Sequence, residues 1–284
     1  MGGILFAQTP ANVSATSVAQ VSSQVTAQSI PQIQTSTTTA STEQKVGLPL
    51  SLSLGIEYAQ KVAVEAGGER ESTTDITIAP SYKINSILTA AGNIVFSKEN
   101  SGARQSSVSN TTVNLGIKGI KISESLETLH SVGGVIPTNE DSIKRDRLKG
   151  AAVLTNGLRW TNPFAKIEYK LGLSKNFHEF TENAEGSANV EYRLTNSLNV
   201  VVPLTDKFSI SALGIYRLGR TYKGFQRNAF EIHSDLNYDI LEKLAINIGT
   251  SNDGSALKAN GVDSNIEAYN ENTSIIRAGL TLTL

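Results

Sequence analysis

Apolar and polar residues alternate with a period of two along most of this 284-residue chain. In the first clear run, one side carries Leu48, Leu50, Leu52, Leu54, Ile56 and Tyr58. Alternation of this kind is typical of a β-strand with one apolar face. It recurs to the last residue and predicts about twelve strands, near residues 48–58, 75–82, 88–96, 113–118, 126–136, 152–160, 166–174, 189–202, 208–217, 230–238, 244–249 and 276–284.

The links between these runs alternate in length. Tight turns are expected at 83–85, 123–125, 161–163, 204–206 and 239–242, and longer polar links at 63–70, 98–105, 138–146, 176–186, 220–227 and 252–270. Short periplasmic turns, long outer loops and an even strand number are typical of membrane barrels. We therefore expect an all-β fold, a transmembrane antiparallel up-and-down β-barrel over residues 46–284, with both termini on the periplasmic side.

A soluble β-sandwich also alternates, but strand length and aromatic spacing favour the barrel. Several runs reach ten or more residues, whereas a soluble strand has about 5–6 and a membrane-spanning strand about 9–11. Phe208 and Tyr216 lie on one apolar face, as do Phe230 and Tyr238, each pair eight positions apart. That spacing covers roughly 20 Å along the membrane normal and predicts one aromatic ring near each interface.

The first 45 residues have a different composition. No charged residue precedes Glu43, and residues 8–45 are rich in Ser, Thr, Gln, Ala and Val. Such a segment predicts a disordered periplasmic tail, and a segment that threads into the lumen is the alternative. The apolar stretch 4–7 ends in a small residue, as a remnant of a secretory signal would; an ordinary chain start is the other interpretation.

The chain ends inside a strongly alternating strand, on Leu284. The ending resembles the C-terminal assembly signal of bacterial outer-membrane β-barrel proteins, with Arg277, Gly279, Leu282 and Leu284 at its four positions. The last residue departs from the family, in which it is most often Phe. The resemblance implies a Gram-negative outer-membrane protein that meets the barrel assembly machinery, outer-membrane lipids and lipopolysaccharide. It also implies that the last strand closes the barrel against the first.

Composition excludes several other classes. The net charge is −1, so no basic excess indicates nucleic-acid binding. The chain has no Cys, which excludes disulfides and Cys-based metal sites. No apolar stretch of 18 residues exists, which excludes a membrane-spanning helix. We expect neither a cofactor nor a bound metal.

The polar faces of the predicted strands are rich in charge and form the candidate pore lining. It comprises Glu57, Asp75, Lys118, Arg159, Lys166, Glu168, Lys170, Glu191, Arg193, Arg217, Glu231, His233, Asp235 and Arg277. Basic residues gather on the middle strands and acidic residues near the two ends of the barrel sequence. One interpretation is two lumen walls of opposite sign that face each other and act on passing solutes. The other is that the charges pair across strands and fill the interior.

Catalytic motifs are absent from the sequence. A barrel phospholipase with about twelve strands uses Ser, His and Asn on its outer rim, and His130 beside Ser131 is the candidate pair here; adjacent strand residues, however, point to opposite faces. We therefore expect no enzyme. The expected function is an outer-membrane channel for passive diffusion of small hydrophilic solutes or ions. The alternative is a structural or interaction barrel with an occluded lumen, acting through its loops or N-terminal tail.

Overall fold

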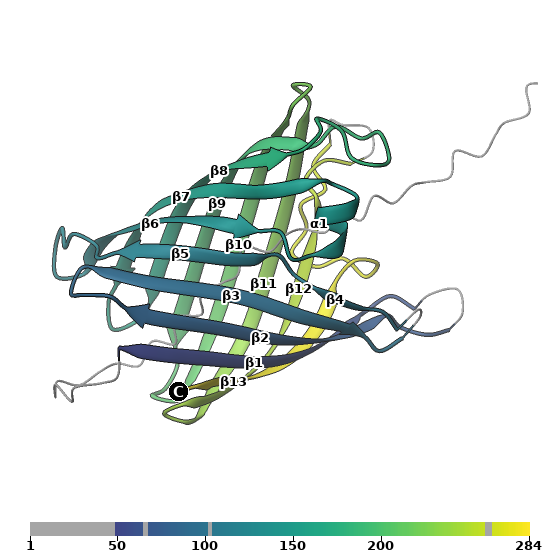
Figure 1. Cartoon of the computed structure of the whole chain (residues 1–284). Coiled ribbons are helices and arrows are strands. Elements are labelled where there is room, and N and C mark those ends of the chain that lie inside the picture. The colour runs from purple at the N-terminus through teal and green to yellow at the C-terminus, as the bar shows by residue number, and fades with distance from the viewer. Residues whose placement is uncertain (1–48, 65–67, 102–103, 259–262) are drawn as a thin grey trace, which may run out of the picture.

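A computed structural model describes residues 49–64, 68–101, 104–258 and 263–284. The expected signal remnant and N-terminal tail lie outside the described residues. The elements are β1 (Leu50–Lys61), β2 (Ser72–Lys83), β3 (Leu88–Glu99), β4 (Ser106–Val108), β5 (Thr111–Ile117), β6 (Leu126–Ile136), α1 (Glu140–Lys144), β7 (Leu148–Thr161), β8 (Lys166–His178), β9 (Val190–Pro203), β10 (Phe208–Thr221), β11 (Gln226–Leu241), β12 (Leu244–Ser255) and β13 (Ile275–Thr283) (Figure 1).

These strands form a closed antiparallel barrel, as the alternation predicts. Each strand pairs with its neighbour in the chain, and β13 pairs with β1 to close the ring. Strands β4 and β5 follow each other along the same edge of β3 and share one position in the barrel. The fold is therefore a 12-strand barrel.

The barrel turns its apolar faces outward and its polar faces inward. Outward side chains such as Ile56, Leu154 and Ile248 are 49%, 49% and 54% exposed. The alternating positions carry charges and amides, and Glu168 and Arg217 are only 5% and 2% exposed. A soluble protein places its apolar faces inside, so this inversion is typical of a barrel surrounded by hydrocarbon.

Aromatic side chains lie at two levels of the outer wall. Across β10 and β11, Phe208 is directly opposite Tyr238, and Tyr216 is directly opposite Phe230. The eight-residue spacing on each strand therefore produces two aligned aromatic pairs, one towards each end of the barrel. The first pair, with Tyr238 44% exposed, agrees with an expected aromatic girdle, whereas Phe230 of the second pair is only 2% exposed.

The strict alternation of short and long links is wrong at the link between β10 and β11. β10 and β11 remain paired out to Arg220 and Gln226, so the link at 222–225 is short, with Gly224 in the left-handed region at φ 83°. The tight turn expected at 123–125 is present, because the backbone N–H groups of Ile122 and Ser123 both donate to the Leu126 carbonyl, at 2.8 and 3.1 Å. In the link between β10 and β11, strand pairing extends into residues that the polar composition predicts as a long loop.

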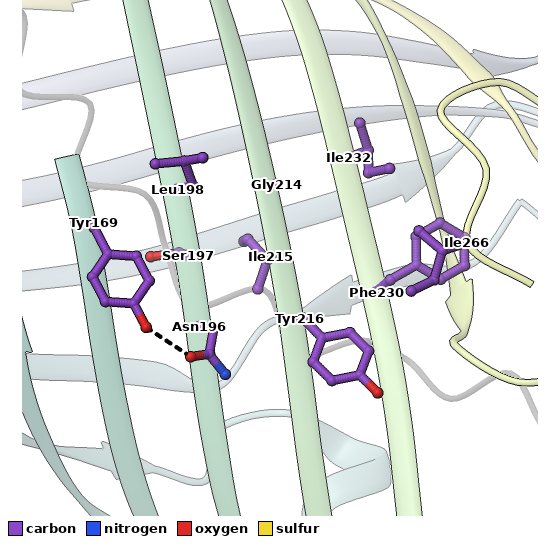
Figure 2. A pocket seen from close by; sticks show the side chains of 10 residues that line it. All are labelled: Tyr169, Asn196, Ser197, Leu198, Gly214, Ile215, Tyr216, Phe230, Ile232 and Ile266. Atoms are coloured by element: carbon purple, nitrogen blue, oxygen red, sulfur yellow. Dashed lines mark hydrogen bonds between the residues drawn. The ribbon is translucent and has the colours of Figure 1, made fainter. Parts of the chain in front are cut away.

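The connection from β12 to β13 folds over the outside of the barrel. Its Ile266 lies with Phe230, Tyr216 and Ile232 around one hollow on the outer wall of β8 to β11 (Figure 2). The amide of Asn252 donates to the Glu267 carbonyl at 2.7 Å, and Thr273 Oγ1 donates to Asn252 Oδ1 at 2.7 Å. Phe230 and Asn252 consequently are 2% and 1% exposed although they lie on the outward face.

The closing seam brings both ends of the described chain to the end of the barrel with the short turns. Leu52 and Leu284 exchange two backbone hydrogen bonds, of 3.1 and 2.9 Å, and Lys83 donates to the Pro49 carbonyl at 2.6 Å. Leu284 thus takes part in the closure as its last residue (Figure 1).

Candidate lumenal site

Twelve of the fourteen predicted pore-lining side chains lie on the inward face, alternating with the exposed apolar positions. The two exceptions are Lys118 and Glu191. Lys118 lies beyond the end of β5 and is exposed. Glu191 lies at a bulge, where Thr221 pairs with Val190 and Arg220 with Tyr192, and its carboxylate lies 3.5 Å from Lys175 Nζ. The extra residue of a bulge shifts the alternation by one position.

The first inward cluster centres on Arg159 of β7. Its Nη1 donates to Glu127 of β6 at 2.7 Å and its Nε donates to Glu168 of β8 at 2.7 Å. The Glu168 carboxylate also lies 3.2 Å from Lys166 Nζ and 3.0 Å from Lys170 Nζ. Two acids and three bases on three neighbouring strands thus form one charge network.

The sequence prediction omitted Glu127. Both faces of its strand carry apolar residues, so period-two alternation does not assign its direction. The strand register assigns the direction of the Glu127 side chain. Glu127 is directly opposite Arg159, and Arg159 is directly opposite Glu168.

The second cluster joins β10 and β11. Arg217 Nη2 donates to Glu231, and Glu231 also contacts His233 Nε2. The Nε and Nη1 atoms of Arg217 are buried and have no hydrogen-bond partner among the described residues. Because buried charges are stable only when compensated, Glu231 is the group that holds Arg217 in the wall.

The third cluster spans the closing seam. Arg277 of β13 donates to Asp235 of β11 at 2.7 and 2.6 Å, and its Nη1 lies 3.5 Å from Glu57 of β1. β12 lies between Arg277 and Asp235, and Gly249 occupies the position paired with both. A Cβ atom there would lie 2.1 Å from Asp235 Oδ1, so the glycine makes room for the contact.

At Arg159, Arg217 and Arg277 the charges therefore pair between nearby strands. Asp75 lies directly opposite Glu57 in the adjacent strand. Lys170 and Glu57 have more exposed side chains than their partners, 38% and 31%. These two side chains are consequently the best-placed charges for contact with a solute in the lumen.

Within the described ranges, no group of three or more His, Asp or Glu side chains could hold a metal ion. The part of the chain that the structure describes contains no helix long and apolar enough to cross a membrane.

Comparisons with known proteins identify the fold. No family model matches the sequence, and no curated protein does. An outer-membrane channel from Pseudomonas putida F1 aligns with a TM-score of 0.57 at 9% identity, over 86% of this chain and all of that one. The NanC porin aligns with a TM-score of 0.54 at 12% identity, over 82% of this chain and all of that one. The chain therefore has the fold of outer-membrane channel barrels.

Proposed function

We propose that this protein is an outer-membrane channel through which small hydrophilic solutes or ions diffuse passively. The observation that carries the proposal is the inverted barrel, with an apolar outer wall and charged clusters on its inner wall. Such an outer wall is stable in the hydrocarbon of a lipid bilayer, because its side chains are apolar and closure of the barrel pairs the backbone groups of every strand. The shared fold with two outer-membrane channels supports the same assignment. Passage through the lumen requires no chemical step, so this function is not enzymatic.

The proposal includes the setting of the barrel. Bacterial outer-membrane lipids and lipopolysaccharide would surround the apolar wall, and both termini would face the periplasm with the short turns. The barrel assembly machinery would read the ending formed by Arg277, Gly279, Leu282 and Leu284. The remaining partners would be small solutes, and no nucleic acid is involved.

Single-channel recording tests the proposal directly. Refolded full-length protein in a planar bilayer should give discrete current steps, and the same preparation heated until it unfolds should give none. If the folded protein shows no steps over a wide voltage range, the channel proposal is wrong. A gel band that shifts on heating establishes independently that the barrel had folded.

A further inference from the structure

The outward face of β6 and β7 carries three polar side chains in one cluster. Thr128 and His130 are two residues apart on β6, so they share one face of the strand, and Asn156 lies directly opposite His130 in β7. The surrounding outward side chains are apolar and exposed: Val132, Leu154 and Leu158 at 46%, 49% and 43%. Ionisable residues on a hydrocarbon-facing wall are rare and commonly functional.

The hydrogen bonds of this cluster fix the proton on one ring nitrogen. His130 Nδ1 lies 2.8 Å from Asn156 Oδ1, and His130 Nε2 lies 2.8 Å from Thr128 Oγ1. An amide oxygen only accepts, so Nδ1 carries the proton and donates it. Nε2 is then free to accept, and the Thr128 hydroxyl donates to it. The Ile120 backbone N–H donates to the same hydroxyl oxygen at 2.8 Å.

A hydroxyl that donates to an imidazole, which is oriented in turn by a third group, is the arrangement of an activated nucleophile. We propose that Thr128, His130 and Asn156 form an acyl-transfer site on the outer wall of the barrel. Thr128 Oγ1 is the nucleophile, His130 is the general base, and Asn156 is a positioning residue that acts through His130.

The surroundings of the site indicate an acyl ester of a lipid as substrate. Thr128 is the third residue of β6, close to the end of the barrel with the short turns. The adjoining link carries exposed Ile120 and Ile122, at 68% and 59%, and the exposed lysines Lys118 and Lys121. An acyl chain would lie along the apolar wall while an anionic headgroup met the lysines.

The chemistry balances with water as the co-reactant. Nε2 takes the proton from Thr128 Oγ1 while this oxygen bonds to the ester carbonyl carbon. The bond from that carbon to the alcohol oxygen then breaks, and the alcohol leaves with the proton from Nε2. Water, deprotonated by Nε2, attacks the acyl–Thr128 ester, releases the fatty acid and restores the threonine.

The test uses refolded full-length protein in detergent micelles, with a fluorophosphonate probe and a long-chain p-nitrophenyl ester. We expect one covalent adduct, on the peptide that contains Thr128. Thr128→Val and His130→Gln should each lower ester hydrolysis by at least about 100-fold, and Thr128→Ser should retain it. Ser131→Ala is the matched control, because Ser131 adjoins His130 but points inward, and it should hydrolyse at the wild-type rate.

The positioning role of Asn156 is tested by measuring kcat and KM separately, because a merely structural role would not change kcat alone. Asn156→Ala should lower kcat and leave KM unchanged, whereas Asn156→Asp, which keeps an acceptor oxygen, should restore kcat. The proposal is overturned if folded wild-type protein forms no adduct and hydrolyses no ester, or if Thr128→Val hydrolyses as fast as wild type. Single-channel currents should be the same in Thr128→Val and wild type, so failure here is distinguishable from failure of the channel.

Discussion

At the residue scale, Gly249 shows how one missing side chain determines a lumenal contact. It lies on β12 between Asp235 and Arg277, and a Cβ atom would come within 2.4 Å of the Ser234 carbonyl and 2.1 Å of Asp235 Oδ1. The backbone conformation of Gly249 is ordinary for a strand, because it is not among the glycines with positive φ. Gly249 is therefore required because a larger side chain has no room at this position.

We predict that Gly249→Ala destabilises the barrel by about 1–3 kcal/mol, the usual cost of overpacking. The added methyl group must displace either the Asp235 carboxylate or the neighbouring backbone. Gly172→Ala is the matched control, since Gly172 also faces inward and its Cβ would meet nothing closer than 3.7 Å. Urea unfolding in lipid vesicles measures both, and equal midpoints for the two variants would contradict the prediction.

The Arg217–Glu231 pair gives a second prediction at this scale. Removing one partner of a buried ion pair leaves an uncompensated charge and costs about 3–5 kcal/mol. Glu231→Gln should therefore reduce the free energy of unfolding strongly, because Arg217 already has two guanidinium nitrogens without partners among the described residues. The double variant Arg217→Met/Glu231→Met should lose much less free energy of unfolding than the sum of the losses in Arg217→Met and Glu231→Met. Additive losses in a double-mutant cycle would show that the pair is not coupled.

At the scale of elements, the connection from β12 to β13 is held on the outer wall by Asn252. Its side chain receives a hydrogen bond from Thr273 and donates one to the Glu267 carbonyl. We predict that Asn252→Ala releases this connection and accelerates trypsin cleavage after the exposed Lys258. Asn272→Ala is the control, because the hydrogen bond that Asn272 makes to the described part of the connection comes from its backbone N–H, to Asn270 Oδ1 at 2.9 Å. Equal cleavage rates in both variants would mean that Asn252 does not hold the connection.

Period-two alternation predicts the strands and the closed barrel, because lipid-facing positions recur at every second residue. It does not predict which charges meet, since this depends on register. Arg277 and Asp235 are 42 positions apart and meet across a third strand. The same limit applies to Thr128 and Asn156, which only the pairing of His130 with Asn156 brings together. Glu191 is predicted to line the pore, and this prediction is wrong because a bulge shifts the alternation locally.

At the scale of the whole molecule, the charge clusters of the inner wall lie over β6–β8, over β10–β11 and at the closing seam, and their members largely neutralise one another. A solute in the lumen would therefore respond chiefly to the charges with the most exposed side chains. Lys170, at 38%, has the most exposed side chain of the cluster around Arg159, and Glu57, at 31%, has the most exposed side chain of the cluster around Arg277.

Reversing the sign of these exposed charges should therefore change ion selectivity in opposite directions. We predict that Lys170→Glu shifts the reversal potential in a salt gradient towards cation selectivity, because it places negative charge beside the conducting path. Glu57→Lys should shift it towards anion selectivity. Lys207→Glu, in an exposed turn outside the barrel wall, changes net charge equally and should shift the potential much less. If all three variants keep the wild-type reversal potential, these side chains do not line a conducting path, whatever the conductance.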